Sequence, residues 1–173
     1  MMSKVYLIGD THWGHKNAIK WREQFSTPEE HDEIIFDNIM STVTKRDTLW
    51  LLGDCIMDNQ ALIKLKALKN HVNRLHWVLG NHDTDNQFRY ALMRNAVCGG
   101  LVDSVHGLYK YKKSWLSHAP IHPDELRGKF NVHGHVHTNT LDDPRYFNVS
   151  CENINYTPIN YQEILGRMKD VRE

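Results

Sequence analysis

The sequence holds a set of oxygen and imidazole side chains in short polar segments that follow apolar runs. In chain order, the set is Asp10, His12, Asp54, Asn81, His82, His118, His135 and His137. No cysteine is among them, so the donors suit manganese, iron, zinc, nickel or cobalt and disfavour a structural zinc site built from thiolates. They are too many for one tetrahedral ion, and their number suits two ions that share a carboxylate. Asp54 is the best candidate for that carboxylate because it lies in the middle of the set.

A pair of divalent cations would give this set a definite chemistry. Two cations about 3.5–4 Å apart hold a phosphoryl group and lower the pKa of bound water toward about 7, which supplies hydroxide at neutral pH. A carboxylate between the cations makes their mutual repulsion tolerable. Such a pair of cations could hold a phosphoryl group and activate a water molecule between them.

Three apolar runs lead into this set, and each ends in glycine. They cover residues 5–8, 49–52 and 75–79, and they are followed by Gly9-Asp10, Gly53-Asp54 and Gly80-Asn81. Apolar runs without alternation are typical of strands in a sheet whose two faces are both covered. Because ligand sites in open α/β sheets lie at the carboxyl ends of strands, these polar residues are well placed for a common site.

Helical signals separate the strands. Thr27, Pro28 and Glu30 have the types of an N-cap, a first-turn proline and a capping-box glutamate. Asn59 is the expected cap of a second helix, and Asn160 starts a last one. A third helix is expected over residues 85–94, and further strands over residues 101–105, 108–111, 114–117, 129–132 and 146–149. We therefore predict a layered α/β fold in a single domain that spans residues 1–173.

Composition narrows the class of protein. Lys plus Arg equals Asp plus Glu at 21 each, so we expect no strong binding to nucleic acid. No apolar run approaches the roughly 20 residues that cross a bilayer, and the first strand-like run is too short for a signal peptide. The three widely spaced cysteines indicate reduced thiols. These features predict a cytoplasmic protein that does not bind membranes.

Five short motifs strengthen the prediction of a phosphoesterase. They are GDTH at 9–12, GD at 53–54, GNHD at 80–83, SH at 117–118 and GHVH at 134–137. Their order and spacing resemble those of the calcineurin-like metallophosphoesterase family, and GNHD with a downstream G-H-x-H is the specific part. The resemblance implies a small single-domain phosphoesterase. Its α/β fold would be a β-sandwich flanked by helices, in four layers of order α-β-β-α.

The resemblance also implies a role for each residue of the set. Three residues would bind the first cation: Asp10, His12 and His137. Three others would bind the second cation: Asn81, His118 and His135. Asp54 would bridge the two cations, and His82 would protonate the leaving oxygen or stabilise the phosphate, which suits an imidazole near neutrality. Manganese is the expected metal, with iron, nickel, zinc and cobalt as alternatives.

A few neighbouring residues have less definite roles. His15 and Asn17 extend the first motif, and we expect them to contact substrate or support the ligands. Asp83 is expected to orient a neighbouring imidazole, with capping of the following helix as an alternative. His133 alternates with His135 and His137 and is expected to be structural or to support the ligands.

The expected substrate is a small phosphate ester, either a monoester or a diester, and we favour a phosphodiester or a nucleotide. The sequence leaves two alternatives open: a metal-binding scaffold of the same fold without catalysis, and a nuclease that acts on polynucleotides. The complete set of donors argues against the first alternative, and the balanced charge argues against the second. The sequence does not indicate an oligomeric state.

Overall fold

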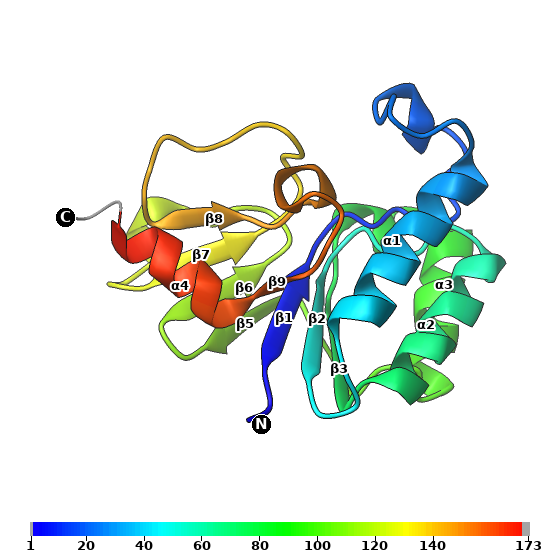
Figure 1. Cartoon of the computed structure of the whole chain (residues 1–173), viewed down its shortest axis with the longest axis horizontal. Helices are drawn as coiled ribbons and strands as arrows, with labels where there is room; N and C mark the ends of the chain where they lie inside the picture. Colours follow the sequence, from blue (N-terminus) through cyan, green and yellow to red (C-terminus); the bar gives the residue numbers. More distant parts are fainter. Residues whose placement is uncertain (1, 171–173) are drawn as a thin grey trace.

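Two β-sheets pack face to face in the computed structural model, which describes residues 2–170 (Figure 1). The first sheet has the strand order β4-β3-β2-β1-β9, and the second has the order β5-β6-β7-β8. The strands are β1 (Val5–Ile8), β2 (Thr48–Leu52), β3 (Arg74–Val78), β4 (Ser104–His106), β5 (Leu108–Tyr111), β6 (Ser114–Ser117), β7 (Phe130–His133), β8 (Tyr146–Asn148) and β9 (Ile159–Asn160). Strands β1 to β4 are parallel, as are β6 to β8, whereas β9 and β5 are antiparallel to their neighbours.

The central strands of the first sheet, β1 and β2, carry apolar side chains on both faces because both faces are covered. Side chains on one face pack between the sheets, and they include Leu7, Trp50, Leu52 and Val78. Side chains on the other face pack against helices, and they include Tyr6, Ile8, Leu49, Leu51, Leu75 and Trp77. Successive residues of a strand point to opposite faces, so a strand covered on both sides must be apolar throughout. The predicted strands at residues 5–8, 49–52 and 75–79 are thereby confirmed to within one residue.

Four α-helices flank the sheets: α1 (Pro28–Thr42), α2 (Asn59–His71), α3 (Gln87–Cys98) and α4 (Tyr161–Asp170). Thr27 caps α1, as predicted, and its side chain accepts a hydrogen bond from the Glu30 N–H. The cap predicted for α2 was one residue late, because Asp58 accepts the N–H of Ala61 and Asn59 is the first helical residue. Among residues 2–170, no helix is both long enough and apolar enough to cross a lipid bilayer.

The helices lie on both sides of the pair of sheets. In Figure 1, α1, α2 and α3 lie beside the first sheet, and α4 lies beside the second. Tyr161, Ile164 and Met168 of α4 join the core between the sheets, where the helix packs against β1, β9 and β8. The predicted α/β fold, a β-sandwich flanked by helices, is therefore confirmed.

The two sheets meet where their strands end. The Gly9 N–H, just after β1, donates to the Val149 carbonyl, just after β8, at 2.8 Å. The imidazole Nδ1 of His118, just after β6, donates to the Leu52 carbonyl at the end of β2, at 2.9 Å. These contacts bring the loops that follow the strands of both sheets to one place. Polar residues from distant parts of the sequence therefore gather there.

Candidate metal centre

The predicted ligands lie in the loops at this meeting point and form two groups. The first donor group consists of Asp10, His12 and His137. The second donor group consists of Asp54, Asn81, His118 and His135. In each group, the carboxylate and two imidazoles place one donor atom apiece within 4.8 Å of one another. Each group combines loops of the first sheet with loops of the second.

The second donor group converges on a single nitrogen. Asp54 Oδ2, Asn81 Oδ1 and His135 Nδ1 lie 3.2, 3.1 and 3.1 Å from His118 Nε2, respectively. One ring nitrogen carries at most one proton, so it cannot donate to all three neighbours. Oxygen and imidazole donors crowded in this way are the arrangement that a divalent cation requires.

Hydrogen bonding fixes the tautomer of His118. Its Nδ1 must carry the proton because the Leu52 carbonyl only accepts, and a neutral ring therefore presents the Nε2 lone pair to the group. Without a cation, burial disfavours the charged ring. The hydrogen bond to Asp54 and the charges of Asp54 and Asp10 outweigh this effect and raise the pKa of His118 to about 9. The same proximity lowers the pKa of Asp54 against the opposing effect of its burial. The centre therefore attracts positive charge.

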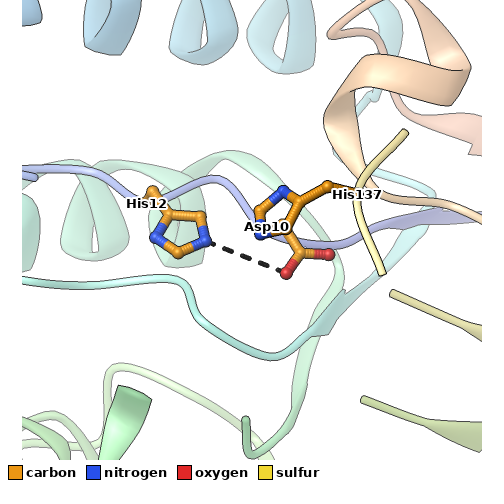
Figure 2. A group of neighbouring side chains, drawn as sticks. All are labelled: Asp10, His12 and His137. Carbon is orange, nitrogen blue, oxygen red and sulfur yellow. Dashed lines mark ion pairs between the residues drawn. The ribbon is translucent and has the colours of Figure 1, made fainter. Parts of the chain in front are cut away.

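The first donor group is more deeply buried. The dashed line in Figure 2 marks the 3.8 Å separation of His12 Nε2 from Asp10 Oδ1. The rings of His12 and His137 lie 5.3 Å apart between centroids. Burial raises the pKa of Asp10, against the effect of His118 and His137. Burial, followed by the charge of Arg22, lowers the pKa of His12 well below its usual value, so this ring is neutral and ready to bind a cation.

Unpaired polar atoms in the first donor group suit the binding of a divalent cation. Within residues 2–170, Asp10 Oδ1 and both ring nitrogens of His12 have no hydrogen-bond partner. The two residues are only 0% and 3% exposed. Leaving a buried polar atom unpaired costs about 1–3 kcal/mol. A cation bound between Asp10 and His12 would satisfy two of these three atoms, so the residues fit the metal that the sequence predicts.

Five of the donors have a backbone conformation that L-amino acids rarely adopt. The φ angles of Asp10, His12, Asp54, His135 and His137 are 57°, 49°, 51°, 73° and 50°. Such left-handed conformations cost of order 1–3 kcal/mol each in residues other than glycine, and they concentrate at functional sites. The surrounding fold therefore holds the donors in strained positions, which indicates a functional role for their placement.

Gly134 makes room for a carboxylate. A Cβ atom at this position would lie 2.3 Å from Asp10 Oδ2 and 3.2 Å from the Leu52 carbonyl oxygen. The space lets Asp10 Oδ2 accept the N–H of His135 at 2.9 Å. The glycine of the GHVH motif is thus required by the close packing of Asp10 against this loop.

His82 lies at the exposed edge of the centre, outside both donor groups. Its backbone N–H donates to Asp54 Oδ1, and its ring lies 6.1 Å from that of His12. His82 Nδ1 is 2.8 Å from Asp85 Oδ2, which also accepts from Arg89. We take the 3.1 Å approach of Arg89 to His82 Nδ1 as a result of this shared acceptor, because two donors do not bond each other. Among residues 2–170, the hydrogen bonds of the His82 ring involve Nδ1 and not Nε2.

His15 and Trp21 form a second part of this edge. The ring of His15 lies 5.7 Å from that of His12 and 5.3 Å from that of Trp21. Burial, followed by the charges of Arg89 and His82, lowers the pKa of His15. Trp21 is 51% exposed. The edge of the centre therefore combines basic groups with an accessible aromatic surface, and the sequence analysis did not identify Trp21 or Arg89.

The Asp83 carboxylate contacts backbone N–H groups, and among the hydrogen bonds of residues 2–170 none joins it to an imidazole. This buried carboxylate accepts hydrogen bonds from the N–H groups of Asp54, Cys55 and Gly80. Burial raises its pKa to about 6, although these hydrogen bonds act in the opposite direction. The cap of α3 is Asn86, so Asp83 does not have that role either. Asp83 holds the loop that carries Asp54, which is a different support from the one expected.

Two other residues lie outside the donor groups. Asn17 is exposed at the start of a short 3₁₀ helix (Ala18–Lys20), and its side chain forms no capping hydrogen bond. His133 is buried, and its Nδ1 donates to the Gly134 carbonyl at 2.8 Å. This contact supports the loop that carries His135, in agreement with the structural role expected for His133.

Two charged residues outside the sequence motifs, Arg22 and Glu152, support His137. Glu152 Oε1 accepts from His137 Nδ1 at 3.0 Å and from Arg22 Nε at 2.8 Å. Burial opposes the charge of Glu152, but the contacts with His137 and Arg22 lower its pKa to about 2. The hydrogen bond to Glu152 raises the pKa of His137, against burial. No spacing in the sequence predicts these contacts, because Arg22 and Glu152 meet only in the folded chain.

The chain resembles known proteins over almost its whole length. The family model for calcineurin-like phosphoesterases matches residues 3–170. An uncharacterized protein of Methanocaldococcus jannaschii is 29% identical, with 95% of this chain and 90% of that protein aligned. The gene 66 protein of Mycobacterium phage L5 is 27% identical, with 79% of each chain aligned. The crystal structure of a protein of unknown function from Aquifex aeolicus has a TM-score of 0.69 and 26% identity, covering 95% of this chain and 98% of that one.

Proposed function

The chain belongs to the calcineurin-like phosphoesterase family, and from this membership we propose that it hydrolyses small phosphate esters with two divalent cations. We further propose that it prefers phosphodiesters or nucleotides to other esters. Manganese is the metal that we propose, and iron, nickel, zinc or cobalt would suit the same oxygen and imidazole donors.

One observation carries the proposal: two adjoining donor groups contain crowded or unpaired metal-binding atoms. Asp54 is the proposed bridge, since one of its oxygens faces His118 and its carbonyl accepts the N–H of His12. Every donor that the family motifs imply is present, and His82 lies beside them. This completeness supports an active enzyme over a metal-binding scaffold.

The bound cations would neutralise the charge of the phosphate and provide hydroxide at neutral pH. The protein must then deliver a proton to the leaving oxygen. His82 is the proposed donor, through Nε2, because Asp85 holds its Nδ1 and orients the ring. Arg89 would keep the negatively charged ester at this edge.

The substrate preference that we propose rests on Trp21. Its indole packs against His15, which in turn lies beside His12, and about half of its surface is exposed. Stacking of a base on an aromatic side chain contributes about 1–3 kcal/mol and tolerates any base. An aromatic group on the ester, such as a nucleobase, would therefore gain affinity here.

A substrate panel tests the proposal. Chelated protein would be reloaded with Mn²⁺, Ni²⁺, Zn²⁺ or Mg²⁺ and assayed with nucleoside monophosphates, cyclic nucleotides and nucleotide phosphodiesters. We expect hydrolysis that depends on added metal, with the highest kcat/KM for a nucleotide phosphodiester or cyclic nucleotide. Failure of every metal to support hydrolysis of any ester would contradict the function, and a preference for esters without a base would contradict the substrate class.

A further inference from the structure

Arg22 is a buried cation whose three kinds of nitrogen are all engaged. Its residue is 1% exposed, and it donates from Nε to Glu152 at 2.8 Å and from Nη2 to the Asp10 carbonyl at 2.7 Å. Its Nη1 donates to His31 Nε2 at 2.6 Å. A buried guanidinium is tolerated only when it is paired and hydrogen-bonded in this way. Two of its three partners connect Arg22 to the first donor group, because Asp10 belongs to this group and Glu152 contacts His137.

Glu152 connects Arg22 to His137 through one atom. Oε1 accepts from both Arg22 Nε and His137 Nδ1. The proton is thereby held on Nδ1 of His137, which leaves the lone pair of Nε2 for a cation. A carboxylate in this position orients a ligating imidazole and increases its basicity.

The other side of Arg22 is anchored to α1. Because arginine always donates, His31 Nε2 accepts and His31 Nδ1 carries the proton that it donates to Asp32 Oδ1 at 2.8 Å. Asp32 Oδ2 accepts the N–H of Gly14 at 2.7 Å. Arg22 is thus held from two directions, and its position relative to Asp10 and Glu152 is fixed.

The second donor group has separate supports. His118 is oriented by the Leu52 carbonyl, and Asp54 is held by the His82 N–H and, through its own N–H, by Asp83. Among the hydrogen bonds found within residues 2–170, none joins Arg22 or Glu152 to a member of the second donor group. Arg22 and Glu152 therefore contact the first donor group directly and reach the second only through contacts between the groups, such as that of the His135 N–H with Asp10 Oδ2.

We propose that Glu152, fixed by Arg22, is a positioning residue that sets the cation affinity of the first donor group and leaves the second group unaffected. This inference rests on the proposed two-cation function. Arg22 and Glu152 lie outside the family motifs, and through them the two donor groups would bind their cations with unequal affinity. The sites would then fill with metal in separate steps.

Titration of chelated protein with Mn²⁺ tests the inference without an assay of activity. Binding would be followed by calorimetry and by the electron paramagnetic resonance of free Mn²⁺, in the wild type and in Glu152→Ala. We expect one of two Mn²⁺ equivalents to weaken by about 10–100-fold, the usual effect of removing such a support. The other equivalent should keep its affinity. His137→Ala and His118→Ala serve as references that identify the first and second sites.

A double variant separates positioning from folding. Glu152→Ala alone leaves Arg22 buried without its carboxylate, which lowers stability. Arg22→Met/Glu152→Ala removes both charges, and we expect metal-free thermal stability to recover while the first-site affinity stays low. If affinity recovered together with stability, Glu152 would have only a structural role and the inference would be wrong. Glu163→Ala/Arg167→Met is the matched control, because this exposed ion pair lies on α4.

The remaining outcomes are also decisive. Equal weakening of both equivalents in Glu152→Ala would contradict the inference and leave the proposed hydrolysis standing. Two Mn²⁺ equivalents without hydrolysis of any ester would contradict the proposed function alone. No uptake of Mn²⁺ by the wild type would contradict both.

Discussion

His118 Nε2 lies 3.2 Å from Asp54 Oδ2, so a residue that follows β6 of the second sheet is paired with one that follows β2 of the first. The pair lies at the centre of the second donor group, and it holds the pKa of His118 at about 9 in the absence of metal. The Asp54 carboxylate thus has two roles: it attracts the cation, and it places a negative charge beside His118. A single substitution would remove both.

Asp54→Asn tests the role of this carboxylate. The amide keeps the shape of the side chain but not its charge, so we expect Mn²⁺ affinity to fall by about 100-fold or more, beyond the effect usual for a supporting residue. Hydrolysis should be lost with the metal. Calorimetric titration of chelated protein measures the change, with Glu163→Gln as a surface control. Wild-type uptake of two equivalents by Asp54→Asn would rule out the bridging role.

His82→Ala should separate catalysis from metal binding. The ring lies outside both donor groups, so we expect both Mn²⁺ equivalents to remain. Loss of a general acid reduces turnover by about 10²–10⁴-fold. Esters with good leaving groups should be affected less, because they need less protonation. Loss of a metal equivalent in this variant would show that His82 is a ligand and not the acid.

Trp21→Ala should change substrate preference and leave chemistry intact. If a base stacks on the indole, kcat/KM for a nucleotide ester should fall by about 5–150-fold, which corresponds to about 1–3 kcal/mol. A phosphodiester without an aromatic group should be hydrolysed as before. Quenching of tryptophan fluorescence by AMP gives a second measurement, in which Trp21→Phe should lose most of the signal. Equal losses on both kinds of ester would refute the stacking role.

His15→Ala and Asn17→Ala test the two residues that extend the first motif. His15 packs between His12 and Trp21, whereas Asn17 is exposed and lies outside the donor groups. We expect His15→Ala to raise KM several-fold at unchanged metal stoichiometry, and Asn17→Ala to have a smaller effect. If both variants kept wild-type kinetics, the prediction that this segment contacts substrate would fail.

Asp103 lies outside the metal centre, and we expect it to make the stability of the protein depend on pH. Burial opposes its charge, but the Leu75 N–H, Lys69 and Arg74 lower its pKa to about 2. A carboxyl group whose pKa is lowered by folding contributes stability above its unfolded pKa of about 3.9, and that stability is lost as pH falls toward 2. We expect Asp103→Asn to cost about 1–3 kcal/mol at pH 7, with little difference from the wild type near pH 2. Urea unfolding at both pH values measures this, and an equal cost at both would contradict the ion pairing.

The sequence predicted the parts of the site that depend on local signals. Asp10, Asp54 and Asn81 each follow a glycine at the end of an apolar strand. Because ligand sites lie at the carboxyl ends of such strands, this pattern predicted that the three residues belong to the site. Helix starts were predicted to within about two residues. The remaining error arises because neighbouring polar side chains can cap the same N–H groups, as Asp58 and Asn59 could at the start of α2.

The supports of the donors could not be predicted in this way. Arg22 and Glu152 are separated by 130 residues and touch only because the segment after β1 folds back over the loop after β8. Asp83 was expected to hold an imidazole, yet three backbone N–H groups surround its carboxylate. Such contacts depend on tertiary packing, and neither residue type nor spacing indicates them.

Each donor group draws on both sheets, and this has a mechanical consequence. Asp10 and His12 follow β1 of the first sheet and His137 follows β7 of the second, while Asp54 and Asn81 face His118 and His135 in the same manner. A cation in either group would therefore act as a cross-link between the two halves of the sandwich. Removal of metal should loosen one sheet from the other, so the melting temperature of the protein would rise with each ion taken up.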